Sequence, residues 1–306
     1  MFTKRDIECM SDGQRVNFMA VFQNIEERLT RNGNSSYLMG NLQCSGAIPY
    51  KVWSNAPCFV ELKCNADAYK GVVCEIAGKV NVYEGQVSVV IDTCRIPQGS
   101  NIPDVMDFYD SKYDVDRYWG LLYGTIQKNC SENAVKVFDL VMEEFKEPFL
   151  KEFGAIYHHD NCKSGLLGHT TKLVKLESIL NMYPEVVKRS GGRDVLYIGG
   201  ALHDIGKVLE YYNGGISAAG RHLCHTILGS MVISAYEKEI IDLMGEEFYL
   251  NLVSIVSSHS GEYGERPRTV CAYVVHLLDT LESKLASLEE LAVNPQQISY
   301  EGYKLN

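Results

Sequence analysis

The sequence predicts a multidomain protein with an all-β barrel at its N-terminus and an all-α domain after it. The hydrophobic period changes from about two residues to about 3.6 beyond a stretch at 97–103 that contains two prolines and a glycine. All 8 histidines lie between His158 and His276. Residues 1–103 are electrically neutral, so the net charge of −10 belongs to the remainder. A chain of 306 residues is long enough for each part to have its own core.

Residues 1–103 contain the strand signals. Apolar alternation is found at 16–22, 36–42, 48–53, 72–80 and 82–91, and turn residues occupy 31–34 and 83–86. Five short strands with one irregular stretch between the third and the fourth are typical of a small Greek-key barrel of the OB type. We therefore expect residues 1–103 to form such a barrel.

Helical periodicity dominates the rest of the chain. Segments at 115–128, 134–145 and 147–153 predict a helical connector over residues 104–154. From residue 165 onward the pattern is almost wholly helical, so residues 155–306 are expected to form one helical domain. The acidic excess argues against a long duplex as a partner, because phosphate binding requires clustered cations. It suits a region that holds divalent metal.

Aromatic and basic side chains of the predicted barrel are candidates for nucleic-acid binding. Barrels of this type bind single strands by stacking bases on aromatic rings beside scattered cations. The candidates are Tyr37, Tyr50, Lys51, Trp53 and Tyr83. Lys51 and Trp53 are two residues apart, so alternation places both on one face of a strand. The alternative for each aromatic residue is packing in the core or at the rim.

Imidazole and carboxylate side chains recur through the helical part. His203 and Asp204 are adjacent in an apolar, helix-like segment, where one turn could offer a nitrogen and an oxygen to the same ion. Asp279 interrupts an apolar helix, and a buried carboxylate is costly unless it is paired or coordinated. His169, His225 and His259 lie in further helical segments. Each histidine alone could be an ordinary core or surface residue, but together these residues indicate a metal centre.

The order His, His-Asp, His, His, Asp resembles the HD-domain metal phosphohydrolase superfamily. His169, His203, Asp204 and Asp279 match its four defining ligands, and His225 and His259 match the additional pair of its two-metal members. The strings at 202–208 and 281–285, and the approach from His158-His159 to His169, are similar to the bacterial YhaM-type 3′→5′ exoribonucleases, which couple an OB fold to an HD domain. The chain departs from that family at His259-Ser260 and in a shortened loop at 261–267, which borders the substrate entrance there.

The resemblance implies two divalent metal ions, with Mn²⁺ favoured over Mg²⁺ or Fe²⁺. Asp204 is the expected bridging carboxylate, and a hydroxide activated by both metals would attack phosphorus in line. Lys207 is expected to contact a substrate phosphate, although a solvated lysine near a helix C-terminus is the alternative. His222, three residues before His225, is expected to support the ligands or to face substrate. His276 is expected to hydrogen-bond Asp279, three residues later on the same helical face.

These expectations favour a metal-dependent 3′→5′ exonuclease acting on single-stranded RNA or a short oligonucleotide, with DNA also open. An HD phosphohydrolase of small or cyclic nucleotides and a non-catalytic nucleic-acid-binding factor are the alternatives. The sequence lacks an apolar run of about 18 residues and an apolar leader, so we expect a cytoplasmic protein without a membrane span. None of the 10 cysteines forms a CxxC pair, which favours reduced thiols. Assembly into a homo-oligomer is left open.

Overall fold

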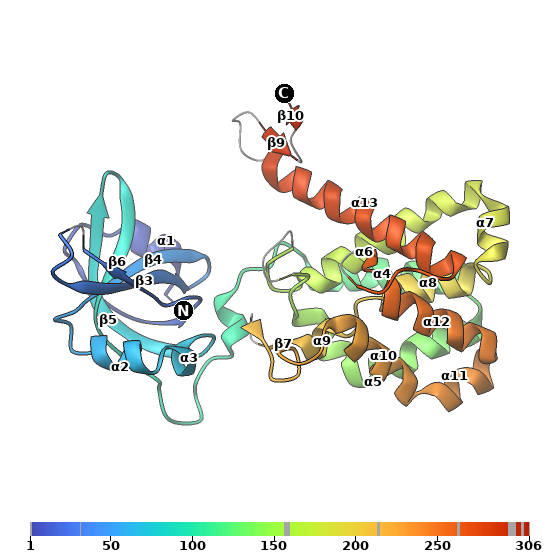
Figure 1. The fold of residues 1–306 in the computed structure, drawn as a ribbon, viewed down its shortest axis with the longest axis horizontal. Coiled ribbons are helices and arrows are strands. Elements are labelled where there is room, and N and C mark those ends of the chain that lie inside the picture. Colours follow the sequence, from blue (N-terminus) through green and yellow to red (C-terminus); the bar gives the residue numbers. More distant parts are fainter. Residues whose placement is uncertain are drawn as a thin grey trace. The chain divides into compact units, whose positions relative to one another are not determined.

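The computed structural model divides the chain into two compact units, Met1–Asp110 and Ser111–Asn306 (Figure 1). The structure describes all residues except 1, 31, 156–159, 213–214, 262–263, 293–297, 301–302 and 306, and it describes side chains up to residue 289. The first unit extends beyond the expected boundary at residue 103. The reason is that the 3₁₀ helix η1 (Val105–Phe108) packs with Val21 and Val73 of the barrel.

The first unit is a barrel of OB topology, which confirms the predicted fold class. Its strands are β1 (Arg15–Phe22), β2 (Glu26–Leu29), β3 (Ser36–Gln43), β4 (Ala47–Trp53), β5 (Val73–Tyr83) and β6 (Gln86–Arg95). The sheet order is β1-β5-β6-β4-β3-β2, and an additional pairing of β1 with β3 closes it. The β4–β6 pair is parallel and the other pairs are antiparallel. This is the closed Greek-key order of an OB barrel.

β1 and β2 act as one bent strand, because both pair with β3. At the bend, the carbonyl oxygen of Asn24 approaches Gly40 so closely that a Cβ there would lie 2.2 Å from it. Only glycine therefore fits at position 40. The short helices α1 (Lys4–Glu8), α2 (Phe59–Cys64) and α3 (Ala66–Tyr69) complete the unit. Ile7, Phe59 and Leu62 contribute to its apolar core, so α1 and α2 pack on the barrel.

The second unit is predominantly helical. Its main helices are α4 (Val115–Asn129), α5 (Glu132–Lys151), α6 (Gly165–Leu176), α7 (Pro184–Arg189), α8 (Arg193–Leu202), α9 (Lys207–Glu210), α10 (His225–Ala235), α11 (Glu237–Met244), α12 (Glu246–Ser258) and α13 (Val270–Ala292). A 3₁₀ helix, η2 (Glu177–Met182), follows α6. Two short hairpins, β7 (Tyr211–Tyr212) with β8 (Gly215–Ile216) and β9 (Ile298–Tyr300) with β10 (Tyr303–Leu305), depart from the all-α expectation.

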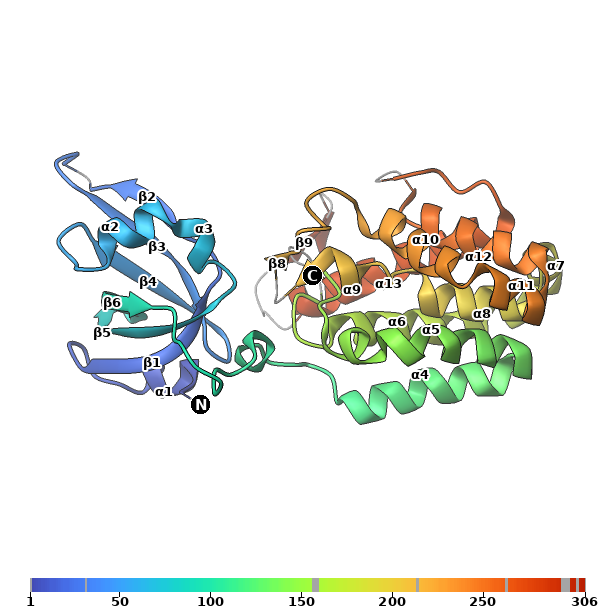
Figure 2. The ribbon, with the colours of Figure 1, turned by 90° about the horizontal axis from the view of Figure 1, so that it is seen from below.

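The expected connector does not stand apart from the helical domain. α4 and α5 pack against α6 and α8, as Figure 2 shows for α4, α5 and α6. Leu122, Phe138 and Phe149 are fully buried in the same apolar core as Leu166 and Leu202. The predicted helices at 134–145 and 147–153 are one continuous helix, α5, with Pro148 inside it. Residues 111–154 therefore help to build the scaffold beneath the functional site.

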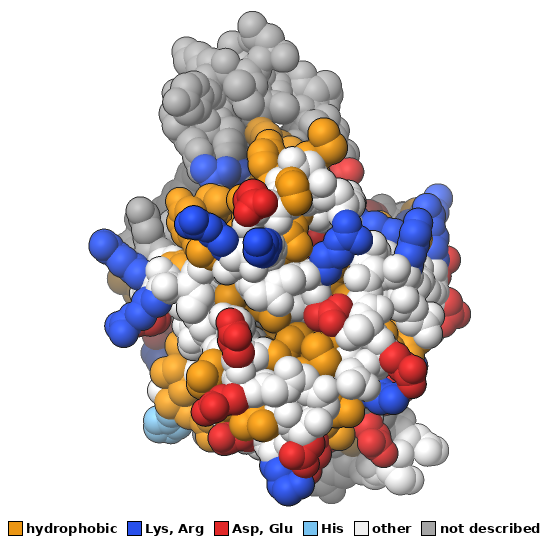
Figure 3. Space-filling model, turned by 90° about the vertical axis from the view of Figure 1, so that its right-hand side faces the viewer, with side chains coloured by type: hydrophobic (Ala, Val, Ile, Leu, Met, Phe, Trp, Pro, Cys, Tyr) orange, Lys and Arg blue, Asp and Glu red, His pale blue; other side chains and the backbone are white. Residues whose placement is uncertain are grey.

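Charged side chains are unevenly distributed over the surface. Figure 3 shows one face of the molecule on which Lys and Arg gather in the upper part and Asp and Glu in the lower part. The net charge of −10 therefore does not describe every part of the surface. Among the described residues, no helix is long and apolar enough to cross a membrane. All ten cysteines are free thiols.

Candidate metal centre

His203 and Asp204 lie at a break between two helices, and not inside one helix as expected. α8 ends at Leu202, His203 is its C-cap, and α9 begins at Lys207. At Gly206 the backbone passes so close to α10 that a Cβ would lie 1.9 Å from the carbonyl oxygen of His225. The break therefore brings Asp204 next to the N-terminal turn of α10. Both His203 and Asp204 are buried.

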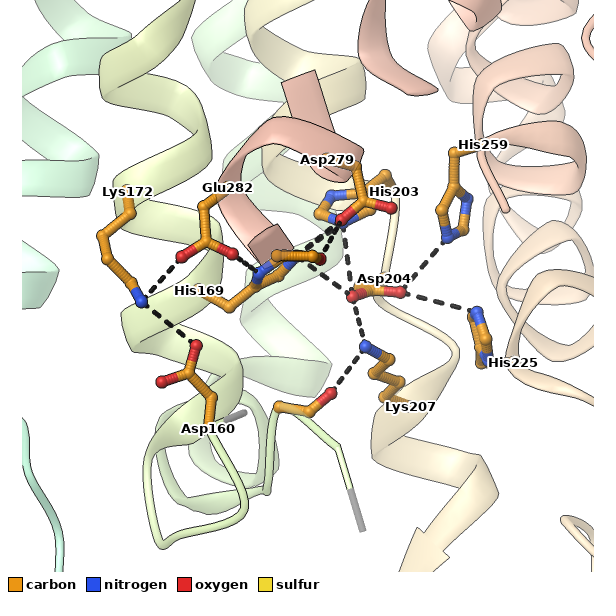
Figure 4. Close-up of polar contacts among 12 residues, drawn as sticks. Asp160, His169, Lys172, His203, Asp204, Lys207, His225, His259, Asp279 and Glu282 are labelled. Carbon is orange, nitrogen blue, oxygen red and sulfur yellow. Dashed lines mark hydrogen bonds and ion pairs between the residues drawn. The ribbon is translucent and has the colours of Figure 1, made fainter. Parts of the chain in front are cut away.

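One carboxylate oxygen of Asp204 faces two histidines, and the same two histidines face Asp279 (Figure 4). Its Oδ2 lies 3.6 Å from Nε2 of His169 on α6 and 3.2 Å from Nε2 of His203. Oδ1 of Asp279 on α13 lies 3.2 Å from the same nitrogen of His169 and 4.0 Å from that of His203. Ligand atoms of His169, His203 and Asp279 all lie within 4.8 Å of one another. Three separate helical segments thus bring two nitrogens and two oxygens together.

The other oxygen of Asp204 faces a different pair of histidines. Its Oδ1 lies 3.6 Å from Nε2 of His225, at the start of α10, and 3.3 Å from Nε2 of His259, the C-cap of α12. This oxygen is buried and accepts no hydrogen bond from the described residues. A buried carboxylate oxygen without a donor is costly, and a cation held between it and the two imidazoles would satisfy it. The donor set fits a divalent metal on each side of Asp204.

The four histidines all direct Nε2 toward this centre because their Nδ1 atoms are held from behind. The partners of Nδ1 are Glu282 for His169, the carbonyl of Gly200 for His203 at 2.7 Å, Oε2 of Glu210 for His225 at 2.9 Å, and the carbonyl of Val256 for His259 at 3.1 Å. Such contacts set the tautomer and ring orientation of histidine ligands in metalloproteins. Glu210 and Glu282 were not singled out by the sequence. Glu282 had two signals: it lies in the string at 281–285 that resembles the YhaM-type family, and it follows Asp279 by three residues. Glu210 had no such signal.

A chain of buried charges lies behind His169. Glu282 pairs with Lys172, whose Nζ is 2.6 Å from Oε1 of Glu282 and 3.1 Å from Oδ2 of Asp160. Asp160 is buried and also accepts a hydrogen bond from the hydroxyl of Tyr113. Lys172 therefore forms ion pairs with two carboxylates at once. This role could not be predicted from the sequence, because Lys172 is one of two lysines on its helix.

The electrostatics of the centre depend on this pairing. Burial by itself would raise the pKa of Asp204, but Lys207 and His203 hold it well below its ordinary value. Burial by itself would lower the pKa of His169, but Asp279 and Glu282 raise it to about 10. Burial lowers the pKa of His259, which keeps its ring neutral at pH 7 and able to donate an electron pair. The centre therefore holds ionised carboxylates next to histidine rings, and most of these side chains are buried.

Lys207 lies in the wall of the centre. Its Nζ is 2.6 Å from Oδ2 of Asp204 and donates a hydrogen bond of 2.6 Å to the carbonyl of Gly154. Its side chain is only 13% exposed, so the solvated-lysine alternative is wrong. Burial by itself would lower the pKa of Lys207, but Asp204 outweighs this effect and raises it. The ammonium group is thus charged and fixed beside the carboxylate that both halves of the centre share.

The two further histidines lie elsewhere than expected. His276 contacts the carbonyl of His259 through Nδ1 at 2.6 Å, and its expected bond to Asp279 is absent from the described contacts. It packs on Gly261, which has a positive φ of 56° and no room for a Cβ. His276 thus supports the segment that carries His259. His222 is exposed, and its ring has no described contact with the centre.

Ser260 lies next to the second pair of histidines. Its Oγ is 3.4 Å from Nε2 of His225 and 3.4 Å from Nε2 of His259, at the position where the chain departs from the YhaM-type pattern. His158 and His159, and part of the loop at 261–267, lie outside the described residues.

Three of the five barrel candidates form one cluster on β3 and β4. Tyr37 and Trp53 are directly opposite in the β3–β4 register, with ring centroids 5.3 Å apart. Nζ of Lys51 lies 5.9 Å from the ring centroid of Tyr37 and 6.0 Å from that of Trp53. Arg28 is opposite Tyr37 on β2, so the register places it on the same face. Arg28 was missed because its strand carries no apolar alternation.

The remaining barrel candidates separate. Tyr83 lies at the end of β5, beside the β5–β6 turn, and its side chain is accessible to a ligand because it is 67% exposed. Tyr50 is buried, and its hydroxyl donates a hydrogen bond of 2.9 Å to the carbonyl of Asn24. The interpretation of Tyr50 as a binding residue is therefore wrong, because β4 alternation turns it into the barrel core while Lys51 and Trp53 face outward.

Residues 167–284 match the family model for the HD domain. The second unit therefore contains an HD domain. The match spans the helices that supply all six residues of the centre, from His169 to Asp279. HD domains belong to a metal-dependent phosphohydrolase superfamily and bind divalent metals.

Solved structures match parts of the chain at low identity. A chain of a replication protein A heterotrimer bound to ssDNA is 15% identical, with a TM-score of 0.22, over 30% of this chain and 63% of that chain. The second OB-fold domain of replication protein A from Methanococcus maripaludis is 16% identical, with a TM-score of 0.24, over 31% of this chain and 94% of that one. Asparaginyl-tRNA synthetase from Pyrococcus horikoshii is 14% identical, with a TM-score of 0.24, over 50% of this chain and 37% of that chain.

Proposed function

We propose that this protein is a metal-dependent phosphodiesterase that shortens single-stranded RNA from its 3′ end. One observation carries the proposal: the two oxygens of Asp204 face two separate sets of histidines, as a carboxylate shared by two metals requires. His169, His203, Asp204 and Asp279 would hold one ion, and Asp204, His225 and His259 the other. Bound divalent ions would supply an activated water at neutral pH and neutralise charge on the phosphoryl oxygens.

The side chains of the HD domain would prepare this chemistry. Glu282 and Glu210 fix the imidazoles of His169 and His225, so that little reorganisation is needed when substrate binds. Lys207 adds a fixed positive charge at the wall of the centre, where it could also meet a phosphate oxygen. We propose Asp204 and Lys207 as the catalytic pair on these grounds.

The barrel supports a polymer as the substrate. Two aromatic rings and one cation lie together on a face of β3 and β4, from Tyr37, Trp53 and Lys51. If β1 and β2 are counted as one strand, β3 and β4 are the second and third strands of the OB order. That face, together with the loop between the last two strands, is where OB folds bind oligonucleotides. Tyr83 lies beside this loop. We propose these four residues, with Arg28, as the contacts for a single strand.

The test compares nucleic acids with small phosphodiesters and nucleotides, and it uses two variants. End-labelled single-stranded RNA and DNA are incubated with Mn²⁺ or Mg²⁺, alongside bis(p-nitrophenyl) phosphate and a panel of linear and cyclic nucleotides. We expect stepwise shortening of RNA from the 3′ end. Asp204→Asn should abolish turnover of every substrate, whereas Trp53→Ala should weaken RNA turnover alone, because stacking contributes about 1–3 kcal/mol per base.

Other outcomes would replace the proposal. Turnover of nucleotides without shortening of RNA would identify a small-molecule phosphohydrolase. Binding of RNA without turnover under any divalent metal would identify a non-catalytic factor.

A further inference from the structure

The outer face of α13 carries a line of apolar side chains. Val270, Tyr273, Leu277, Leu281 and Leu285 are 42%, 54%, 50%, 41% and 50% exposed. We call this set the α13 stripe. Its members are three or four residues apart, so they follow one side of the helix over about 22 Å. Figure 1 shows α13 along an edge of the helical unit.

Among the described residues, the apolar core of this unit does not include the stripe. The side of α13 that faces the core contributes the buried residues Cys271, Ala272 and Val275, and the helix contacts α6, α7, α8, α12 and the strand β9. A surface helix normally presents polar residues on the side that faces away from the core. The charged residues Lys284 and Glu289 come only near the end of the stripe. Its outward positions from Val270 to Leu281 carry no charge.

The area of the stripe matches the centre of a dimer interface. Five side chains of this size, each about half exposed, leave on the order of 400 Å² of apolar surface, which is as large as the largest patch on a typical monomer. Two such surfaces facing each other would bury about 800 Å² at the centre alone. With a polar rim, the total would exceed the roughly 1,000 Å² that a biological interface must clear.

We propose that the α13 stripe is the contact surface between two copies of this chain. Side chains spaced by four residues form a ridge on each helix. When two identical helices cross at about −50°, the ridge of one fits into the groove next to the ridge of the other. A two-fold axis near Leu277 and Leu281 would place each stripe on the other, as closed symmetric dimers require. Asp279 and Glu282 point to the other side of α13, so each copy keeps its own complete metal centre.

The experiment is sedimentation velocity of the full chain over low to high micromolar concentrations. The wild-type protein should sediment as a dimer. Leu281→Arg places a like charge from each copy at the centre of the interface, so we expect self-association to weaken at least about 100-fold. The matched control is Leu250→Arg on α12, which is 56% exposed and lies outside the stripe, and should remain a dimer. Circular dichroism verifies that both variants are folded.

A second variant tests the geometry. Leu281→Cys, which lies next to the predicted axis, should form a disulfide between two copies under mild oxidation, whereas Leu250→Cys should not. A wild-type protein that remains monomeric at high micromolar concentration would overturn the proposal. So would a dimer that survives Leu281→Arg, or one that is lost in Leu250→Arg. None of these outcomes depends on the proposed RNA substrate.

Discussion

Two carboxylates of the HD unit are equally buried and behave in opposite ways. Asp204 is 3% exposed and Glu177, at the end of α6, is 1% exposed. Burial raises the pKa of Glu177 well above its ordinary value, and neither of its oxygens has a hydrogen-bond partner among the described residues. Lys207 and His203 overcome the same burial effect at Asp204 and hold its pKa low. Burial alone therefore does not mark a functional acid, whereas converging partners do.

The largest expected effect comes from removing the charge of Asp204. Asp204→Asn keeps the shape of the side chain but loses the anion that both halves of the centre share. We expect binding of divalent metal, measured by calorimetry, to be lost from both halves, and hydrolysis to fall by at least about 1,000-fold. The variant also leaves Lys207 without its carboxylate, at a cost to stability of about 3–5 kcal/mol. Unchanged metal binding would contradict the role of Asp204 as the shared ligand.

Metal affinity should fall by a smaller factor when the residues that hold the Nδ1 atoms of the histidines are changed. Glu282→Gln or Lys172→Met should weaken binding of one metal ion about 10- to 100-fold, because His169 is then less firmly oriented. Glu210→Gln should weaken binding of the other ion by a similar factor through His225. Two-site calorimetric titrations with Mn²⁺ can separate the two effects. If all three variants weakened the same ion, the division of the centre at Asp204 would be wrong.

Replacing Glu177 should stabilise the folded protein, whereas replacing Asp204 should destabilise it. Glu177→Met replaces an unpartnered carboxyl with an apolar side chain of similar length, so we expect a gain of about 1–3 kcal/mol in the free energy of unfolding. That gain corresponds to a rise of about 2–10 °C in Tm for a unit of this size. Glu177→Gln should gain less, because the amide also lacks a partner. A loss of stability in the methionine variant would show that the carboxyl has a partner that the described residues do not include.

A third buried carboxylate permits a smaller test by pH. Burial raises the pKa of Glu152 to about 7, although a hydrogen bond from the amide of Phe153 opposes the shift. The folded protein therefore binds a proton that the unfolded chain releases between its ordinary pKa of 4.5 and about 7. The contribution of Glu152 to stability should fall across this window as the pH rises, by about 3 kcal/mol.

The matched variant isolates this contribution. Glu152→Gln cannot titrate, so the difference in the free energy of unfolding between it and the wild type should change from pH 4.5 to pH 7 and then level off. Urea unfolding at a series of pH values measures this difference. A constant difference over the whole range would mean that Glu152 is ionised in the folded protein.

The strands, the helices and the ligand types could be predicted because they depend on neighbouring residues. Alternation located five barrel strands to within a few residues, and it placed Lys51 and Trp53 on one face. The same alternation should have excluded Tyr50, which lies between them and turns inward. The connector was separated wrongly from the helical domain because periodicity does not show which helices share a core.

Other features depended on contacts between distant parts of the chain. Glu210 and Lys172 are 15 and 110 residues from the side chains that they hold, His225 and Glu282. No spacing rule links such pairs. The break at His203-Asp204 was missed because its cause is the close approach of Gly206 to α10, which is a property of tertiary packing.

The sequence by itself determined that a β-barrel precedes a helical unit and that histidines and aspartates are available to bind metal. Periodicity and residue chemistry are local, and they remain readable whatever the chain does later. The tertiary structure decided that the two oxygens of Asp204 face different histidines, that Lys207 is buried beside them, and that Glu177 is left without a partner. These outcomes follow from how helices pack, because packing decides which distant side chains meet and which are only removed from water.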